Sequence, residues 1–377
     1  MRRLRPPRFV LGRPSLSPGS IDIAFDPRGG ANDRVRCLLP LPDGRVLIGG
    51  AFSAFNGVPR CRVAMLAPDG SLDLSFQPEE NCCGPVFALA MQPDGRLLVA
   101  GWGALGTPSI TRLLPDGRVD GSFAFGTEFF GYFYALALLP DGRILVGGSF
   151  TGINGQRMGR IARLLPDGQL DASFRPGGGF QLDVAEGEAC VRALALGPDG
   201  RILAAGRFHS FDGTPRGGIA RLLPDGALDS SFDPCGGCSD PVIALAPLAD
   251  GGAFLGGRVM WFAGGPCDGI VRLDASGRVV RTFKAEQVFD GDVACLIARQ
   301  DASVIASGTV RLSNGEVYDR VVAFRPDGRV DPALPPIEEF DGQVRCMAED
   351  TRGGLLVAGD FGRANGIPRR SILRAGM

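Results

Sequence analysis

Residues 133–176 read FYALALLPDGRILVGGSFTGINGQRMGRIARLLPDGQLDASFRP, and this stretch contains four short apolar runs. Alternating residues from Tyr134 to Leu138 show the period of two that is typical of a β-strand. Pro-Asp-Gly turns at 140–142 and 166–168 join the first run to the second and the third to the fourth. We therefore predict one antiparallel sheet with strands near 134–138, 144–148, 161–165 and 170–174.

Copies of this unit recur along the whole chain. We number them repeat units 1 to 7, and their first strands start near residues 35, 86, 133, 191, 242, 293 and 344. The starts are about 50 residues apart, as in propeller blades. Units 1 to 6 contain all four runs, whereas unit 7 ends one strand short, and the missing strand is matched by SIDIAFDP at 20–27.

This arrangement predicts an all-β fold, a seven-bladed β-propeller of four-stranded antiparallel blades. The N-terminal strand completes the last blade and closes the ring, which leaves no open sheet edge. A linear solenoid would instead need a polar cap at each end. The predicted organisation is a disordered, basic and proline-rich leader at 1–19, followed by a single propeller domain at 20–377.

The repeat also resembles a known family. Its pattern is V-x-A-L-A-x-x-P-D-G-R-I-L-V-G-G-x-F, then N-G, then R-I-A-R-L-x-P-D-G-x-L-D-x-S-F, and it resembles the bacterial delta-60 repeat. The resemblance extends over residues 20–377 and decays at 301–303 and 351–353, where Pro-Asp-Gly is lost. It implies propeller blades, and it carries over no catalytic residue.

Composition and charge narrow the class of protein. Apolar residues make up 45% of the chain and the formal net charge is −1, which is typical of a soluble globular protein without general affinity for nucleic acid. There is neither the apolar core of a secretory signal nor a run of about 18 apolar residues that would span a membrane. We expect a cytoplasmic monomer whose ten cysteines are mostly thiols.

The repeat places its turns and its long loops on opposite sides. The Pro-Asp-Gly turns share one side, so the longer connections share the other, which we call the long-loop face. The connections that enter the first strands are acidic, and we expect them to converge on the channel mouth and to favour a cationic ligand. The alternative is that these loops are acidic because they are solvated. The residues are Glu79, Glu80, Glu128, Asp183, Glu186, Glu188, Asp240, Glu286, Asp290, Asp292, Glu338, Glu339 and Asp341.

The second residue of each first strand varies while its neighbours do not. These residues are Arg36, Phe87, Tyr134, Arg192, Ile243, Ala294 and Arg345. Such variation indicates exposure, so we expect a ligand to be bound by Arg36, Tyr134, Arg192 and Arg345 together with Glu128, Asp292 and Asp341. The alternative is that the aromatic side chains of this region, from Phe129 to Tyr134, fill the space between blades.

Cysteines suggest a second kind of site. Cys235-Gly-Gly-Cys238, Cys190, Cys267 and His209 all fall on the long-loop face in units 4 and 5. Such a set could hold a structural Zn in tetrahedral coordination. The alternatives are free thiols, or disulfides if the protein is exported. By contrast, Cys37, Cys295 and Cys346 replace small residues of the first strands and are predicted to be buried apolar groups.

Few features of the sequence point to catalysis. The single histidine excludes a multi-histidine metal site, and no G-x-S-x-G, Walker or H-E-x-x-H motif occurs. The leading hypothesis is therefore a binding module for a small cationic ligand or a protein segment at the long-loop face. An enzyme of lyase or hydrolase type with its site at the same mouth, and a purely structural scaffold, remain as alternatives.

Overall fold

The fold consists of β-strands throughout the part of the chain that is described. The computed structural model describes residues 16–79, 83–103, 107–126, 129–182, 188–238, 240–259, 261–267, 269–286, 289, 292–311 and 317–377. Across these ranges every regular element is a strand. None of the described residues forms a helix with the length and apolarity needed to cross a membrane.

Each repeat unit folds into one antiparallel sheet in which the first strand pairs with the second and the second with the third. In units 1 to 3 these strands are β1 (Val35–Pro40), β2 (Val46–Gly50) and β5 (Val63–Leu66), then β6 (Cys83–Met91), β7 (Leu97–Gly103) and β8 (Pro108–Leu113), then β10 (Phe133–Leu138), β11 (Ile144–Gly148) and β14 (Ile161–Leu164). The predicted strands of the 133–176 stretch thus agree with the structure within one residue for its first three runs.

The same order continues through the second half of the chain. Units 4 and 5 contain β16 (Cys190–Leu196), β17 (Ile202–Arg207) and β20 (Ile219–Leu222), then β21 (Val242–Pro247), β22 (Ala253–Gly257) and β25 (Ile270–Leu273). Units 6 and 7 contain β26 (Val293–Ala298), β27 (Val304–Arg311), β28 (Val317–Phe324) and β29 (Ile337–Phe340), then β30 (Val344–Glu349), β31 (Gly354–Gly359) and β34 (Ile372–Gly376).

Short hairpins occupy the loops between second and third strands. Their two-residue strands are β3 (Ala54–Phe55) with β4 (Val58–Pro59), β12 (Gly152–Ile153) with β13 (Gln156–Arg157), β18 (Ser210–Phe211) with β19 (Thr214–Pro215), β23 (Trp261–Phe262) with β24 (Gly265–Pro266), and β32 (Arg363–Ala364) with β33 (Ile367–Pro368). Two of these hairpins gain a third short strand from the preceding connection, β9 (Phe129–Phe130) and β15 (Phe180–Gln181). The Asn-Gly pairs at 56–57, 154–155 and 365–366 form their turns, with positive φ at both residues.

The fourth run of most units is not the regular strand that the sequence predicted. In unit 3 only Leu170 bridges to Leu164, and the chain then turns away. Oδ1 of Asp171 accepts a hydrogen bond from the backbone N–H of Ser173, and the N–H of Phe174 donates to the Asp171 carbonyl. These bonds bend the chain, because an aspartate that bonds two residues ahead forms a turn rather than an extended strand. We call this run the fourth segment.

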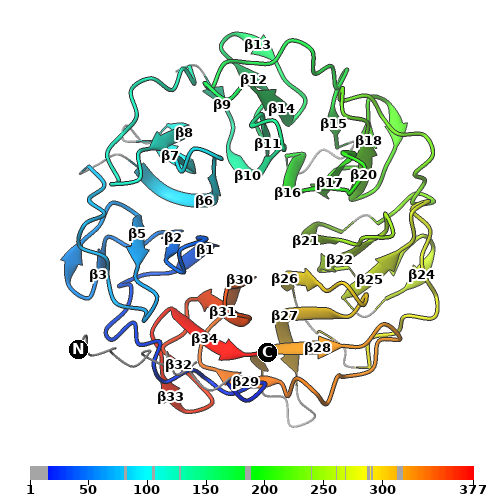
Figure 1. Ribbon diagram of the computed structural model, residues 1–377. Helices are drawn as coiled ribbons and strands as arrows, with labels where there is room; N and C mark the ends of the chain where they lie inside the picture. The colour runs from blue at the N-terminus through cyan, green and yellow to red at the C-terminus, as the bar shows by residue number, and fades with distance from the viewer. Residues whose placement is uncertain are drawn as a thin grey trace, which may run out of the picture.

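The sheets are arranged around a central axis with their first strands innermost (Figure 1). Consecutive first strands lie side by side from β1 to β30, and β30 lies beside β1. The hydrophobic core is divided among the spaces between neighbouring sheets. One cluster joins Leu98 and Ile110 of unit 2 to Phe133 and Val146 of unit 3. Stacking on a neighbour therefore buries the faces that a single small sheet would expose.

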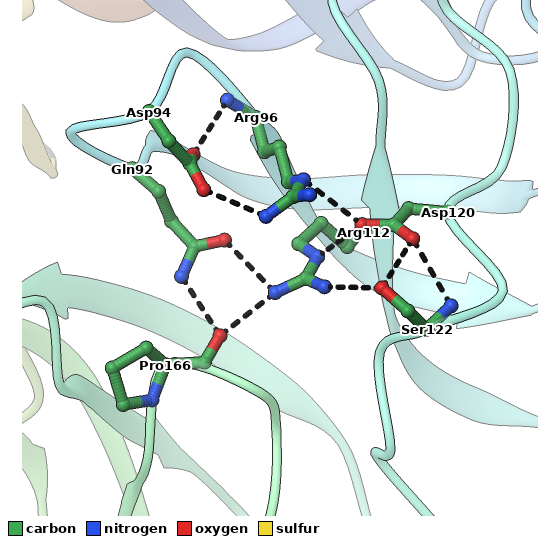
Figure 2. Close-up of polar contacts among 7 residues, drawn as sticks. All are labelled: Gln92, Asp94, Arg96, Arg112, Asp120, Ser122 and Pro166. Carbon is green, nitrogen blue, oxygen red and sulfur yellow. Dashed lines mark hydrogen bonds and ion pairs between the residues drawn. The ribbon is translucent and has the colours of Figure 1, made fainter.

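An arginine on the third strand connects each of several sheets to the next. We call Arg112, Arg163, Arg221 and Arg374 the latch arginines. In unit 2, Nε of Arg112 lies 2.8 Å from Oδ2 of Asp120 in the fourth segment, and Nη1 donates to the carbonyl of Pro166 in the unit 3 turn (Figure 2). Arg163 and Arg221 make the same pair of contacts. The latch thus holds a sheet edge and its neighbour together.

The N-terminal segment lies where unit 7 would need a fourth segment. Ile21 bridges to Ala375 of β34, as Leu170 does to Leu164 in unit 3. Asp22 receives the latch arginine Arg374, whose Nη1 lies 3.3 Å from the carbonyl oxygen of Pro68 in unit 1. Residues 16–19 also contact this strand, since Pro18 bridges to Gly376. We call the boundary between residues 16–25 and β34 the seam.

The latch predicts an acid-sensitive stability. Burial opposes ionisation of Asp171, yet hydrogen bonds from Ser173, Arg163 and Arg143 hold the pKa of its carboxyl well below the ordinary value of 3.8. A depressed pKa stabilises the fold above the unfolded-state pKa, and that stabilisation is lost as the pH falls through the folded-state pKa. We expect an unfolding free energy for Asp171→Asn below that of the native protein at pH 7, with the difference shrinking below about pH 4. Urea denaturation at pH 7, 5, 4 and 3 measures this, and a difference independent of pH would contradict it.

Candidate functional site

Every first strand contains a β-bulge at its variable second residue. The pairing register shifts across this residue in each unit, for example between Val35 and Cys37 of β1 and between Phe133 and Ala135 of β10. We call Arg36, Phe87, Tyr134, Arg192, Ile243, Ala294 and Arg345 the bulge residues. A bulge leaves one residue unpaired and re-aims its side chain. The variation seen in the sequence therefore marks positions that the sheet itself does not constrain.

Four consecutive bulge residues contact one another around the axis. The guanidinium carbon of Arg36 lies 5.0 Å from the centroid of the Phe87 ring, and Phe87 packs edge-to-face on Tyr134 at 5.4 Å. The guanidinium of Arg192 lies 4.3 Å from the Tyr134 ring centroid. Stacking on an aromatic face fixes a guanidinium while its in-plane N–H donors stay available. We call this row the Arg–aromatic row.

The arginines of the bulge residues differ in how their charge is balanced. Arg345 binds the carboxylate of Asp360, with Nε 2.9 and 3.0 Å from the two oxygens and Nη2 2.6 Å from Oδ2. This pair raises the pKa of Arg345. For Arg36, burial and then the charges of Arg345 and Arg34 lower the pKa. Nε of Arg36 is buried and has no hydrogen-bond partner among the described residues. Arg36 is thus a partly desolvated cation next to other cations.

Three of the described acidic loop residues, Asp292, Asp341 and Glu286, bond to groups close to them. Asp292 pairs with the neighbouring Arg258 at 3.3 Å. Asp341 accepts hydrogen bonds from the backbone N–H groups of Gly362 and Arg363 in the next loop. Glu286 likewise accepts from the N–H of Val330, at a fourth segment. These three carboxylates thus bond to backbone N–H groups and to one arginine. Glu128, with Glu80, Asp183, Glu186 and Asp290, lies outside the described residues.

The five residues considered for zinc do not form one cluster, although Cys267 packs against the core that contains Cys238. Within the described part of the chain no group of three or more His, Cys, Asp or Glu side chains is placed to hold a metal ion. Cys235 is exposed, whereas Cys238 is buried in the core of units 4 and 5 with Sγ 3.2 Å from the Asp240 carbonyl oxygen. Cys190 is buried at the start of β16, Cys267 is partly buried in a hairpin, and His209 is partly buried after β17. The C-x-x-C pair therefore points its two thiols into different environments.

A buried carboxyl near the bulge residues serves the backbone. Burial raises the pKa of Asp319. Its Oδ1 accepts from the hydroxyl of Thr309 at 2.9 Å, and its Oδ2 accepts from the N–H of Val344 at 2.7 Å. Because both oxygens are engaged, this carboxyl fixes the start of β30 to unit 6. The arrangement around the bulge residues offers fixed guanidinium donors for binding.

Sequence reasoning missed Asp360, which decides the charge balance of unit 7. Asp360 directly follows the second strand, where Ala51 and Ser149 stand in units 1 and 3. A comparison of units position by position would have found it, because Arg345 and Asp360 are both charged substitutions in one unit. The role of Phe87 as the support of Arg36 was also missed, since the two side chains belong to different units.

Comparison with known proteins supports the fold and leaves the function open. The family described as "Domain of unknown function (DUF5122) beta-propeller" matches residues 41–76, 92–123, 139–174 and 197–232. The chain therefore carries this β-propeller repeat in units 1 to 4. The name delta-60, which the sequence pattern suggested, is not part of that description. No curated protein matches the chain in sequence.

Solved structures resemble this chain at low sequence identity. The structure of U3-55K has a TM-score of 0.59 and 12% identity, over 95% of this chain and 100% of that one. BBS1N in complex with ARL6DN has a TM-score of 0.49 and 17% sequence identity, over 93% of each chain. A gluconolactonase from Xanthomonas campestris has a TM-score of 0.44 and 16% sequence identity, over 92% of this chain and 100% of that one. The likeness to U3-55K concerns the fold alone. The TM-scores of the other two structures are too low to support a conclusion about this chain.

Proposed function

We propose that this protein is a binding module that takes an oxyanion, a carboxylate or phosphate group, at its bulge residues. The observation that carries the proposal is the Arg–aromatic row, in which Arg36 has a buried Nε without a partner among the described residues. The proposed ligand is an anion, in contrast to the cation that the acidic loops suggested, because the fixed donors at the bulges are guanidiniums and three of the loop carboxylates, Asp292, Asp341 and Glu286, bond locally.

The geometry of the row suits anion recognition. Arg36 and Arg192 stand at its two ends, in units 1 and 4, with Phe87 and Tyr134 between them. The aromatic rings hold both guanidiniums in place, which reduces the conformational entropy lost when a ligand binds. Burial, and then the charges of Arg345 and Arg34, lowers the pKa of Arg36, and an incoming carboxylate would favour its charged form. A small dianion or an acidic protein segment has the matching chemistry.

We further propose that the scaffold is a closed seven-bladed propeller. Three features support this: the neighbouring positions of β30 and β1, the bridge from Ile21 to Ala375, and the contacts of Arg374 with Asp22 and Pro68. Such closure would place all seven bulge residues around one axis, which is what lets residues of units 1 to 4 form a single row.

The proposal predicts that binding of a dicarboxylate depends on Arg36 and Arg192. Succinate titrated by calorimetry should bind the native protein, while neutral succinamide should not. Arg36→Met and Arg192→Met should each weaken succinate binding about tenfold or more, because a hydrogen-bonded charge contributes roughly 1.5–3 kcal/mol. Arg118→Met, which removes an exposed charge on the turn side, is the matched control.

Two further titrations identify the class of ligand that binds at the bulge residues. Inorganic phosphate and a peptide rich in glutamate distinguish a small anion from an acidic segment. Equal affinity of succinate for the native protein and for both Arg→Met variants would overturn the proposal, as would equal binding of succinate and succinamide.

A further inference from the structure

A cavity of about 440 Å³ lies at the seam, on the turn side of the molecule. Its lining includes Leu16 and Asp22 from the N-terminal segment, Asp350 and Gly354 from the turn before β31, and Arg374 from β34. The volume is within the range of sites that hold small ligands. None of the bulge residues lines it, so it is separate from the Arg–aromatic row.

In four of the six other units an arginine fills this position, whereas units 5 and 6 have Gly252 and Ser303 there. In units 1 to 4 an arginine begins the second strand and reaches the fourth-segment aspartate: Arg45 to Asp73, Arg96 to Asp120, Arg143 to Asp171 and Arg201 to Asp229, at 3.2, 3.1, 3.3 and 3.0 Å. Figure 2 shows this in unit 2, where Arg96 and the latch arginine Arg112 both converge on Asp120. In unit 7 the corresponding residue is Gly354, and the second guanidinium is missing.

The aspartate at the seam keeps its negative charge but loses donors. Asp22 receives the latch arginine Arg374 and the backbone N–H of Ala24. Asp171 of unit 3 receives in addition Arg143 and the hydroxyl of Ser173. Because Gly354 and Ala24 replace Arg143 and Ser173, the Asp22 carboxylate has fewer hydrogen bonds than its counterpart, and the cavity lies against it.

A second carboxylate adds to the imbalance. Asp350 stands where units 1 and 3 have buried Leu41 and Leu139, and its side chain is only 8% exposed. Its Oδ2 lies 3.5 Å from Nη1 of the same Arg374. Arg352 also lines the cavity, but its Nη1 lies 3.5 Å from the carbonyl oxygen of Pro68. Oδ1 of Asp350 accepts hydrogen bonds from the backbone N–H groups of Arg352 and Gly354, so its Oδ2 is the oxygen that faces the charge of Arg374. Two carboxylates with little exposure thus share one buried guanidinium, and a further cation would improve their charge balance.

We propose that the seam cavity binds a guanidinium group from outside the sheet, in the place that an arginine side chain occupies in units 1 to 4. Asp22 and Asp350 would accept its N–H donors, as Asp120 does for Arg96. An arginine side chain of a peptide partner and a free guanidinium compound share this chemistry. The inference is independent of the function proposed for the bulge residues.

The experiment titrates the full chain with Nα-acetyl-arginine amide and with its uncharged citrulline analogue. We expect the arginine compound to bind at least about tenfold more tightly, because only it supplies the missing charge. Asp350→Leu, which installs the residue of units 1 and 3, should weaken binding at least tenfold. Gly354→Arg should do the same by filling the cavity; its Cβ would lie 3.1 Å from Cγ and Cδ of Arg374, so the Arg374 side chain must shift slightly to admit it. Gly121→Arg, at a site with open space around it, is the control for an added charge.

Two outcomes identify the source of the guanidinium group, and two others would contradict the proposed site. Agmatine binding without peptide binding identifies a free compound, and binding of a Gly-Arg-Gly peptide identifies a protein segment; either supports the site. Equal affinity for the arginine and citrulline compounds would overturn it. So would unchanged binding in folded Gly354→Arg, a variant that decides the question even if Asp350→Leu fails to fold.

Discussion

Arg374→Ala is expected to lower the free energy of unfolding by about 3–5 kcal/mol, the usual cost of leaving a buried charge without its partner. Arg374 and Asp22 are both almost fully buried, at 7% and 6% side-chain exposure. The guanidinium carbon also lies 5.3 Å from the centroid of the Phe25 ring, and Nη1 reaches the carbonyl of Pro68 in unit 1. One truncation therefore removes contacts to the N-terminal segment and to the first unit together.

Chemical denaturation of native and variant protein measures this effect. Arg118→Ala, which breaks an exposed ion pair with Asp116, should leave the midpoint unchanged and serves as the control. Replacing the pair with two apolar residues, Arg374→Met with Asp22→Leu, should recover the part of the loss that comes from leaving Asp22 unpaired, while Asp350 still lacks its guanidinium. An unchanged midpoint for Arg374→Ala would show that the seam contributes nothing to stability.

Gly148→Ala should destabilise the protein by about 3 kcal/mol or more, since overpacking against backbone leaves no side chain that can move aside. A Cβ at Gly148 would overlap the carbonyl oxygen of Tyr132. The close approach arises from the bulge, which brings β10 onto β11 at the register shift between Phe133 and Ala135. The neighbouring Gly147 is restricted by a different contact, because a Cβ there would lie 2.7 Å from Cγ1 of Val191 in unit 4.

Gly121→Ala is the matched control for that substitution. Nothing lies within 4 Å of a Cβ at Gly121, and its φ is outside the left-handed region. Thermal unfolding should therefore show little change for Gly121→Ala and a large drop for Gly148→Ala. Equal unfolding temperatures for the two variants would mean that the bulge tolerates a side chain.

Local sequence patterns predicted the strands well where the conformation of a strand depends on its own residues and the adjoining turns. Alternation and Pro-Asp-Gly turns located the first three strands of the 133–176 stretch within one residue. The fourth run was predicted as a strand because Leu170 to Phe174 looks apolar and alternating. Its conformation is instead decided by the Asp171 side chain, which bonds the backbone of Ser173 and receives two arginines from other strands.

The candidate site was only partly predictable, because its contacts join different units. The variable positions Arg36, Tyr134, Arg192 and Arg345 were identified as a group, and the structure places them at the bulges. Their pairing with one another or with Asp360 depends on which units are neighbours and cannot be read from one unit. The local bonds of the loop carboxylates were not predicted either, because tight loops expose backbone N–H groups to which acidic side chains such as Asp341 bond.

The most direct test of the proposed binding function is a crystal structure of the native protein with saturating succinate. The account predicts a carboxylate within hydrogen-bond distance of the guanidiniums of Arg36 and Arg192, with both still stacked on Phe87 and Tyr134. An ordered succinate bound away from these residues, or an Arg36 whose Nε is occupied by a carboxylate of the chain itself, would contradict it.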